Sequence, residues 1–102
     1  MNKNRERIKR GRLNSLSELP ENKLNIFKTI KEEIDVFYQK DVEVEIFGSH
    51  YWGNWDEFSD YDVVITERGF NCFEVAKKIS ENLKIKVDIF YSRNKVNTIL
   101  IK

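Results

Sequence analysis

Three short segments of the sequence carry residue types that can bind phosphate and a metal ion. Gly48 and Ser49 directly follow an apolar segment, and Asp60 and Asp62 begin another one after a ten-residue connector. A third carboxylate, Asp88, lies inside a third apolar segment. Glycine lets backbone N–H groups approach a phosphate closely, and a serine hydroxyl can donate to one. We interpret these five residues as one phosphate-and-metal site.

The three carboxylates define the chemistry that such a site would perform. Asp60 and Asp62 are one residue apart on a predicted strand, so both side chains point the same way, and Asp88 joins them if its strand is adjacent. Unit charges about 4 Å apart repel by on the order of 4 kcal/mol at an effective dielectric constant of about 20. Mg²⁺ would offset this repulsion, because it takes oxygen ligands from carboxylates and substrate phosphates. Two such ions would stabilise the attacking and leaving oxygens of an in-line phosphoryl displacement.

Structural explanations of the same residues remain open. Lys84 or Lys86 would neutralise a surface acid, and Asp60 would merely cap a turn. A Gly-Ser pair by itself signals only a turn. The single histidine, His50, is expected to be exposed in the connector, and we leave it out of the catalytic set.

Two helices follow from the hydrophobic periodicity. Apolar residues recur every three or four positions between 24 and 37, which predicts an amphipathic helix from Pro20 to about Gln39. Asn71 and Glu74 have the spacing of a capping box, which predicts the start of a second helix. The exposed side of the first helix is expected to carry Lys23, Lys31, Glu32 and Glu33. The apolar stripe of the second is expected to be Phe73, Ala76, Ile79 and Leu83.

Alternating apolar residues predict strands over 42–47, 60–66 and 85–91, and a weaker pattern predicts a last strand over 96–101. The resulting order predicts an α+β fold, an α/β sandwich in which helices cover one face of a small mixed sheet. Parity then puts the three aspartates together on the opposite, open face. It puts three apolar side chains there as well, which suggests a nucleobase, an acceptor or a partner protein as a covering layer: Phe47, Val64 and Phe90.

The composition indicates one domain of 102 residues with a basic arm. Apolar residues make up 40% of the chain and its net charge is +1, but residues 1–12 carry six basic side chains and one acidic one. We expect a frayed arm or short helix over 1–18 and a single domain over 19–102. The arm is interpreted as a solvated tail, with nucleic-acid binding as the alternative. A lone Cys72, no membrane-length apolar segment and no signal-peptide pattern predict a soluble, cytoplasmic protein.

Taken together, Gly48-Ser49, the spacer, Asp60-x-Asp62 and Asp88 resemble the DNA polymerase β-like nucleotidyltransferase superfamily. The most similar members are the minimal nucleotidyltransferases, which are often the antitoxin partners of HEPN-domain toxins. The resemblance implies that Gly48 and Ser49 hold the β- and γ-phosphates of a nucleoside triphosphate (NTP). It implies that Asp60 and Asp62 bind the metals, and that Asp88 completes the catalytic metal site and helps to activate the acceptor hydroxyl.

The implied reaction is Mg²⁺-dependent transfer of a nucleoside monophosphate from an NTP to a hydroxyl of a protein or RNA acceptor, with release of pyrophosphate. The implied partner is a HEPN-like toxin, another acceptor or a second copy of the chain. A binding module that keeps the fold without strong catalysis is the alternative.

One departure from the family pattern concerns the connector. Members often carry a small residue and then an arginine before the glycine at position 53, where this chain has Tyr51 and Trp52. The basic arm or Lys86 would have to replace that guanidinium. Trp52 and Trp55 are expected to pack in a lid or in the core, with stacking on a base as the alternative.

Overall fold

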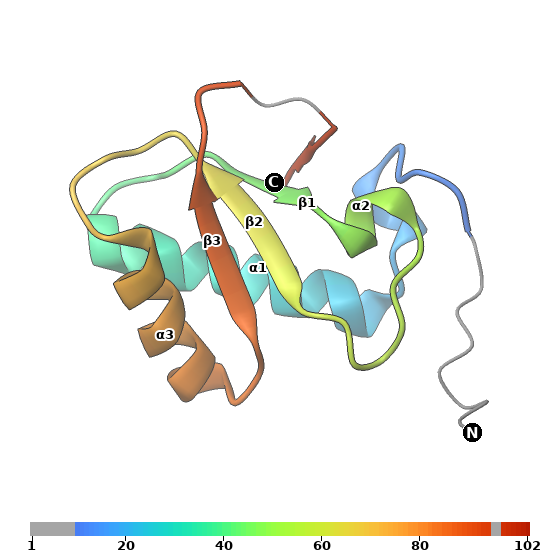
Figure 1. Cartoon of the computed structure of the whole chain (residues 1–102), viewed down its shortest axis with the longest axis horizontal. Helices are drawn as coiled ribbons and strands as arrows, with labels where there is room; N and C mark the ends of the chain where they lie inside the picture. Colours follow the sequence, from blue (N-terminus) through green and yellow to red (C-terminus); the bar gives the residue numbers. More distant parts are fainter. Residues whose placement is uncertain (1–9, 95–96) are drawn as a thin grey trace.

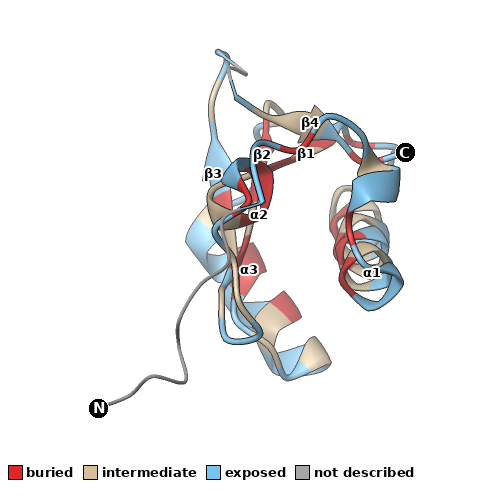
Figure 2. Cartoon of the chain, turned by 90° about the vertical axis from the view of Figure 1, so that its right-hand side faces the viewer, coloured by how far each residue is buried: buried red, intermediate tan, exposed pale blue. Residues whose placement is uncertain are grey.

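The structure, a computed structural model, describes residues 10–94 and 97–102. In chain order its elements are the 3₁₀ turn η2 (Leu16–Glu18), α1 (Glu21–Tyr38), β1 (Val44–Phe47), α2 (Ser49–Trp52), β2 (Tyr61–Ile65), α3 (Cys72–Leu83), β3 (Val87–Tyr91) and β4 (Ile99–Leu100). Figures 1 and 2 show α1 and α3 on the same side of the sheet. The predicted α+β fold with an open sheet face is therefore confirmed. None of the described helices is long and apolar enough to cross a membrane.

The four strands form one mixed sheet in the order β3-β2-β1-β4. β1 is antiparallel to β2 and β4, whereas β2 and β3 are parallel and are joined through α3. The register pairs Phe47 with Asp62, and Asp62 with Asp88, across three neighbouring strands. The predicted last strand is confirmed only as Ile99–Leu100, which pairs with the outer edge of β1, and residues 95–96 lie outside the described part.

The core lies between the sheet and the two long helices, where the buried residues of both layers face each other (Figure 2). Alternation along the strands fills the sheet side of this core as predicted, because every second residue points to the helices. The fully buried apolar side chains include Phe27, Ile30, Ile34, Val42, Val44, Ile46, Val63, Ile65, Ile79 and Val87. The Asn71 side chain caps α3 by accepting a hydrogen bond from the Glu74 backbone N–H at 3.1 Å, as the predicted capping box requires.

The predicted exposures of Phe73, Lys23 and Val64 are wrong. Phe73 is 73% exposed, because Val75 and Ile79 centre the buried stripe of α3 about 140° away from it. Lys23 is only 5% exposed, because it lies four residues before Phe27 on the buried side of α1. Val64 is 5% exposed although it faces away from the helices, because it lies in the central strand β2 with neighbours on both sides.

The described part of the predicted arm is not frayed. The Arg10 and Leu13 backbone N–H groups donate to the carbonyls of Gly53 and Tyr51 at 3.1 and 2.7 Å. Leu13 is 8% exposed, so this segment contributes to the core. A side chain at Gly53, where φ is +86°, would lie 2.0 Å from the Gly11 carbonyl oxygen. The segment therefore packs directly on the end of α2, while residues 1–9 lie outside the described part.

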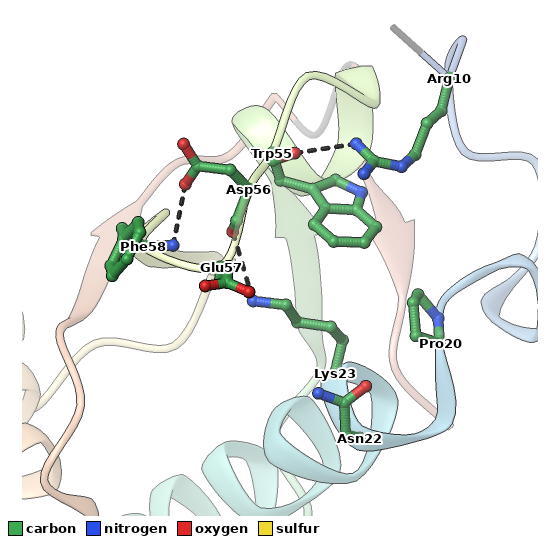
Figure 3. A pocket seen from close by; sticks show the side chains of 8 residues that line it. All are labelled: Arg10, Pro20, Asn22, Lys23, Trp55, Asp56, Glu57 and Phe58. Atoms are coloured by element: carbon green, nitrogen blue, oxygen red, sulfur yellow. Dashed lines mark hydrogen bonds between the residues drawn. The ribbon is translucent and has the colours of Figure 1, made fainter. Parts of the chain in front are cut away.

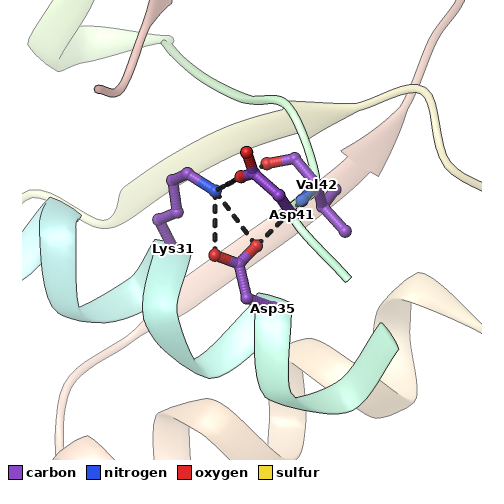
Figure 4. A network of polar contacts seen from close by, with 4 residues as sticks. All are labelled: Lys31, Asp35, Asp41 and Val42. Carbon is purple, nitrogen blue, oxygen red and sulfur yellow. Dashed lines mark hydrogen bonds and ion pairs between the residues drawn. The ribbon is translucent and has the colours of Figure 1, made fainter. Parts of the chain in front are cut away.

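A partly buried network of polar contacts holds the segment between α1 and β1 in place (Figure 4). The Lys31 ammonium donates to both oxygens of Asp35 at 3.0 and 2.9 Å, to Asp41 at 2.7 Å and to the Val42 carbonyl at 2.9 Å. Asp35 in turn accepts from the Val42 N–H at 2.9 Å. The Lys31 side chain is only 16% exposed, so the prediction that it lies on the wet side of α1 is wrong. This network holds Val42 at the entry to β1 and so helps to set the sheet register.

We expect Lys31→Met to lower the free energy of unfolding by about 1–3 kcal/mol, because it leaves Asp35 and the Val42 carbonyl without their shared donor. Urea denaturation monitored by circular dichroism measures this change. Lys28→Met on the exposed side of α1 is the matched control and should change the stability by less than about 0.5 kcal/mol. Equal stability of the two variants would contradict a structural role for the network.

Candidate active site

The turn after β1 brings the predicted phosphate-binding residues against the first carboxylate. Gly48 adopts φ +76° and ψ −147°, and Ser49 begins the short helix α2. A Cβ atom at position 48 would lie 2.5 Å from the Asp62 Oδ2 atom. Both the positive φ and this contact require glycine, because any side chain would be strained and would displace the carboxylate. The structure thus joins the Gly-Ser turn and Asp62 into one site.

The sheet register brings the carboxylates together. Asp62 and Asp88 are direct Cα partners on the parallel strands β2 and β3. Both side chains are partly buried, and alternation directs them away from the helices, as predicted. Asp60 immediately precedes β2, where the Tyr61 N–H donates to the Lys86 carbonyl at 3.0 Å. All three aspartates therefore lie at the amino-terminal ends of two neighbouring strands.

Lys86 provides the positive charge beside these acids. Its ammonium is 3.3 Å from both oxygens of Asp88 and 3.7 Å from Asp60 Oδ2. The Lys86 side chain is 61% exposed, so the ion pairs are screened by water and add little stability. Among the described residues, one exposed ammonium against three carboxylates leaves the site with an excess of negative charge.

That excess charge changes the proton affinity of Asp62. Burial, followed by the negative charges of Asp88 and Asp60, raises the pKa of Asp62 to about 6. Lys86 opposes the shift but does not cancel it. A carboxyl group whose charged form is this unfavourable would gain from any bound cation.

The comparisons with known proteins agree with this geometry. A family model described as "Nucleotidyltransferase domain" matches residues 27–100, which include the Gly-Ser turn and all three aspartates. The chain belongs to the nucleotidyltransferase domain family. A search of curated proteins gives no match. The family match indicates nucleotidyl transfer as the general chemistry of such domains, without defining the acceptor or the antitoxin-like subtype.

Nucleotidyltransferase domains generally use a divalent metal, and the donor set here fits one chemically. Within residues 10–94 and 97–102, however, no group of three or more His, Cys, Asp or Glu side chains is arranged to hold a metal ion. Asp62 and Asp88 supply paired carboxylate oxygens, the ligands that Mg²⁺ prefers, and burial together with the charges of Asp88 and Asp60 raises the pKa of Asp62. Asp60 instead lies near Lys86, so a three-carboxylate site would need Asp60 to turn toward the other two.

Tyr51 and Trp52, which stand where family members often have a small residue and an arginine, lie in different environments in this nucleotidyltransferase domain. Tyr51 is 6% exposed and packs in the core, whereas Trp52 is 48% exposed and lies edge-on against Tyr51. Neither can supply a guanidinium. Arg10, whose backbone N–H donates to the Gly53 carbonyl at the end of α2, also donates to the Trp55 carbonyl at 2.8 Å and covers the Trp55 ring at 3.7 Å from its centroid.

The prediction that His50 is exposed is wrong. His50 is 1% exposed and is stacked between Trp55 and Tyr61, with ring centroids 5.6 and 4.9 Å away. Among the described residues no hydrogen bond of normal geometry reaches either ring nitrogen, although the Asp60 backbone is close enough to oppose the fall in the pKa of His50. Burial, followed by the nearby charge of Lys23, lowers the pKa of His50 to about 4. No periodic signal in the sequence marks His50 as buried, because α2 is too short to show one.

The same stack decides between the alternatives for Trp55. Arg10 covers one face of the indole and His50 lies against it as well, so Trp55 is a packing residue and not a stacking platform for a base. Lys23 supports the stack from α1, because its buried ammonium donates to the Tyr61 hydroxyl at 3.1 Å and to the Asp56 carbonyl at 3.5 Å. Lys23 thereby connects α1 to the residue that separates Asp60 from Asp62.

Figure 3 shows a pocket of about 400 Å³ around this support. Its lining combines cationic, acidic and aromatic side chains from three segments of the chain. None of the predicted site residues lines it, so this pocket is separate from the carboxylate site. The lining residues are Arg10, Pro20, Asn22, Lys23, Trp55, Asp56, Glu57 and Phe58.

We expect the Asp62 carboxyl group to titrate near pH 6 in the metal-free protein, as followed by carboxyl ¹³C NMR. Because the folded state holds this proton more tightly than the unfolded chain, the Asp62 contribution to stability should fall as the pH rises from about 4 to about 6. Asp88→Asn should lower the midpoint, and Lys86→Met should raise it. The exposed Glu81→Gln on α3 is the control and should leave the midpoint unchanged. A midpoint near 4 in the unmodified protein would contradict this electrostatic picture.

We expect His50 to act in the opposite direction. Because the folded state disfavours protonated His50, stability should be complete above about pH 6.5 and should fall by about 2–3 kcal/mol as the pH drops toward 4. His50→Phe keeps an aromatic ring in the stack and removes this dependence. Denaturant unfolding at several pH values gives the change in the free energy of unfolding with pH for the unmodified protein and for the variant. These two slopes can be compared even if the variant is less stable at every pH. If the free energy of unfolding changes with pH in the same way in the unmodified protein and in His50→Phe, then His50 is not buried in its neutral form.

Proposed function

We propose that the chain is a Mg²⁺-dependent nucleotidyltransferase that moves a nucleoside monophosphate from an NTP to a hydroxyl group of a protein or RNA acceptor. The observation that carries this proposal is the contact between Gly48 and Asp62. It puts the Gly48-Ser49 turn, which is suited to bind phosphate, beside the paired carboxylates of Asp62 and Asp88. Either feature alone would be unremarkable in a small α+β domain. Their contact gives a triphosphate and its counter-ions a common location.

In the proposed reaction the acceptor oxygen attacks the α-phosphorus, and the bond from that phosphorus to the bridging oxygen of the β-phosphate breaks. Pyrophosphate leaves with the bond electrons, and the acceptor hydroxyl loses its proton. Bound Mg²⁺ would supply charge stabilisation for the attacking and leaving oxygens. We assign metal binding to Asp60, Asp62 and Asp88, and phosphate binding to Gly48 and Ser49.

Asp88 is the residue that we assign to the acceptor side. Asp88 lies on β3, at the edge of the sheet away from the Gly-Ser turn, with the Asp62 strand between them. An acceptor hydroxyl that approaches from this edge would meet the Asp88 carboxylate before it meets the phosphates. Lys86 contacts Asp88 and would have to yield to the metal.

The minimal, antitoxin-like subtype is part of the proposal, and it implies a protein partner such as a HEPN-domain toxin or a second copy of the chain. A reducing cytoplasm, which the single Cys72 suggested, remains the expected location. The binding module without catalysis is the weaker alternative, because all three carboxylates are present and two of them are paired.

Two measurements test the proposal. Amide NMR with Mg²⁺ and a non-hydrolysable NTP should show shifts clustered at the Gly-Ser turn and the three aspartates. A transfer assay with α-³²P-labelled NTPs, a mixed-sequence RNA oligonucleotide and the chain itself as acceptors should then show label transfer. We expect Asp62→Asn to reduce transfer at least about 10²-fold, because it removes charge where the transition state needs it.

The matched control for this assay is Glu81→Gln, which removes an equal charge from the exposed face of α3. It should keep full activity. Transfer that survives in both Asp60→Asn and Asp62→Asn would overturn the assignment of the carboxylates. NTP shifts outside the Gly48–Asp62 contact would overturn the assignment of the phosphate site.

A further inference from the structure

The open face of the sheet is divided into a charged part and an apolar part. The charged part lies at the amino-terminal ends of β2 and β3 and holds the three aspartates and Lys86. The apolar part begins two residues further along the same strands, where Val64 and Phe90 are direct Cα partners. Phe47 on β1 completes it, although its own Cα partner is Asp62. The two parts therefore meet within about 7 Å, the rise of two residues along a strand.

Two phenylalanine rings meet over β2, the strand that carries Asp62. The ring centroids of Phe47 and Phe90 are 5.1 Å apart, and the rings are nearly perpendicular, at 87°. Because Phe47 belongs to β1 and Phe90 to β3, their contact crosses the strand between them. An edge-on contact occupies the face of only one ring, so the other ring keeps both faces clear of its partner. Phe90 is 47% exposed, which leaves an aromatic surface open beside the carboxylates.

The direction of the proposed reaction follows from the order of the strands. The Gly48-Ser49 turn, which we assign to the β- and γ-phosphates, lies at the end of β1. Asp88, which we assign to the acceptor side, lies on β3, with β2 in between. In an in-line displacement the attacking and leaving oxygens lie on opposite sides of the α-phosphorus. The line through these two oxygens therefore runs across the strands, with Asp62 near its middle.

The nucleoside must leave the α-phosphorus at an angle to this line, because the oxygen that carries it is one of the equatorial oxygens. A nucleoside that stays against the sheet would thus extend along the strands. Toward the amino-terminal end of β2 it would meet the Asp60 and Lys86 side chains, whose charged atoms are 3.7 Å apart. In the opposite direction it would meet the rings of Phe47 and Phe90. A nucleobase is a planar aromatic group, so the ring pair is the favourable surface for it.

We propose that Phe47 and Phe90 form the binding surface for the base of the NTP, while the Gly-Ser turn and the aspartates hold its phosphates and metal ions. This inference rests on the proposed nucleotidyl transfer, because it assigns a further part of the same site. An NTP is divided in the same way as the open face, with an anionic, metal-binding end and an aromatic end. The base surface is continuous with the carboxylate site through the pairing of Phe47 with Asp62.

The composition of this surface also determines which bases it accepts. Phenylalanine rings carry no group that can read the hydrogen-bonding edge of a base. Among the described residues, the polar neighbour in the register is Glu45, the Cα partner of Val64, and it accepts a hydrogen bond from the Thr98 hydroxyl. Selection therefore depends on stacking, which every base can provide and which grows with the area of the ring system. We expect purine NTPs to bind more tightly than pyrimidine NTPs, with ATP and GTP bound about equally.

Isothermal titration calorimetry in the presence of Mg²⁺ tests the base surface. It compares non-hydrolysable analogues of ATP, GTP, CTP and UTP with inorganic tripolyphosphate, which has the phosphates but no base. The purine analogues should bind at least about five-fold more tightly than tripolyphosphate, the smallest factor expected for a stacked base. Phe90→Leu should raise the Kd of the purine analogues at least about five-fold and leave that of tripolyphosphate within about two-fold. Phe90→Trp keeps an aromatic ring and should retain the binding of the unmodified protein.

Phe73→Leu is the matched control, because Phe73 is 73% exposed but lies on α3, on the other side of the sheet. It should leave every Kd within about two-fold. Amide NMR spectra of all variants check that the fold is intact. Equal losses in Phe90→Leu and Phe73→Leu would overturn the inference, and so would a loss of tripolyphosphate binding in Phe90→Leu as large as the loss of NTP binding. A preference of more than about ten-fold between ATP and GTP would overturn selection by stacking.

Three further outcomes separate this inference from the proposed function. Tripolyphosphate binding that Asp62→Asn weakens, together with NTP binding that is no tighter, would keep the phosphate site and overturn the base surface. Phe90-dependent NTP binding by a protein that transfers nothing to any acceptor would keep the base surface and overturn the proposed transfer. Lack of binding of both tripolyphosphate and the NTP analogues at millimolar concentration would overturn both.

Discussion

The Asp62 carboxylate lies against the backbone of Gly48, and this contact depends on three separate features of the fold. It needs the register between β1 and β2, the positive φ of the turn and the absence of a side chain at position 48. A shift of one residue in β2 would direct Asp62 into the apolar core, where an unpaired charge is very costly. The register is in turn fixed by the buried valines and isoleucines on the other face of the same strands. Hydrophobic packing on one side of the sheet therefore determines the electrostatics on the other.

Those electrostatics leave the domain with opposite charges at the two ends of β2 and β3. The amino-terminal ends carry three carboxylates with one exposed lysine beside them, and the carboxyl ends carry two arginines held by Tyr91. Charges of one sign within a few ångströms destabilise a protein unless a counter-charge or a ligand offsets them. A site that must bind a cation has a reason to retain the carboxylates. Phe47 and Phe90 lie between the two ends on the uncovered face.

The connector from α2 to β2 is held in a different way, by aromatic packing around a neutral histidine. His50, Trp55 and Tyr61 stack together, and Arg10 and Lys23 contact the stack from the amino-terminal segment and from α1. A buried histidine without hydrogen bonds is costly when protonated, so the stack is most stable at neutral pH or above. Because Tyr61 directly follows Asp60, the same packing also limits where the first carboxylate can move.

Periodicity alone determined the fold class, the two long helices, the three main strands and the common face of the aspartates, because buried faces recur at fixed intervals along helices and strands. The sequence motif also determined the family. Only the tertiary structure decided the burial of His50 and Lys23, the exposure of Phe73 and the packing of residues 10–18, since these depend on contacts between segments far apart in the chain. The nearness of Arg68 to Arg93 was likewise invisible in the sequence. It arises because two parallel strands, separated by a helix in the chain, end side by side at one edge of the sheet.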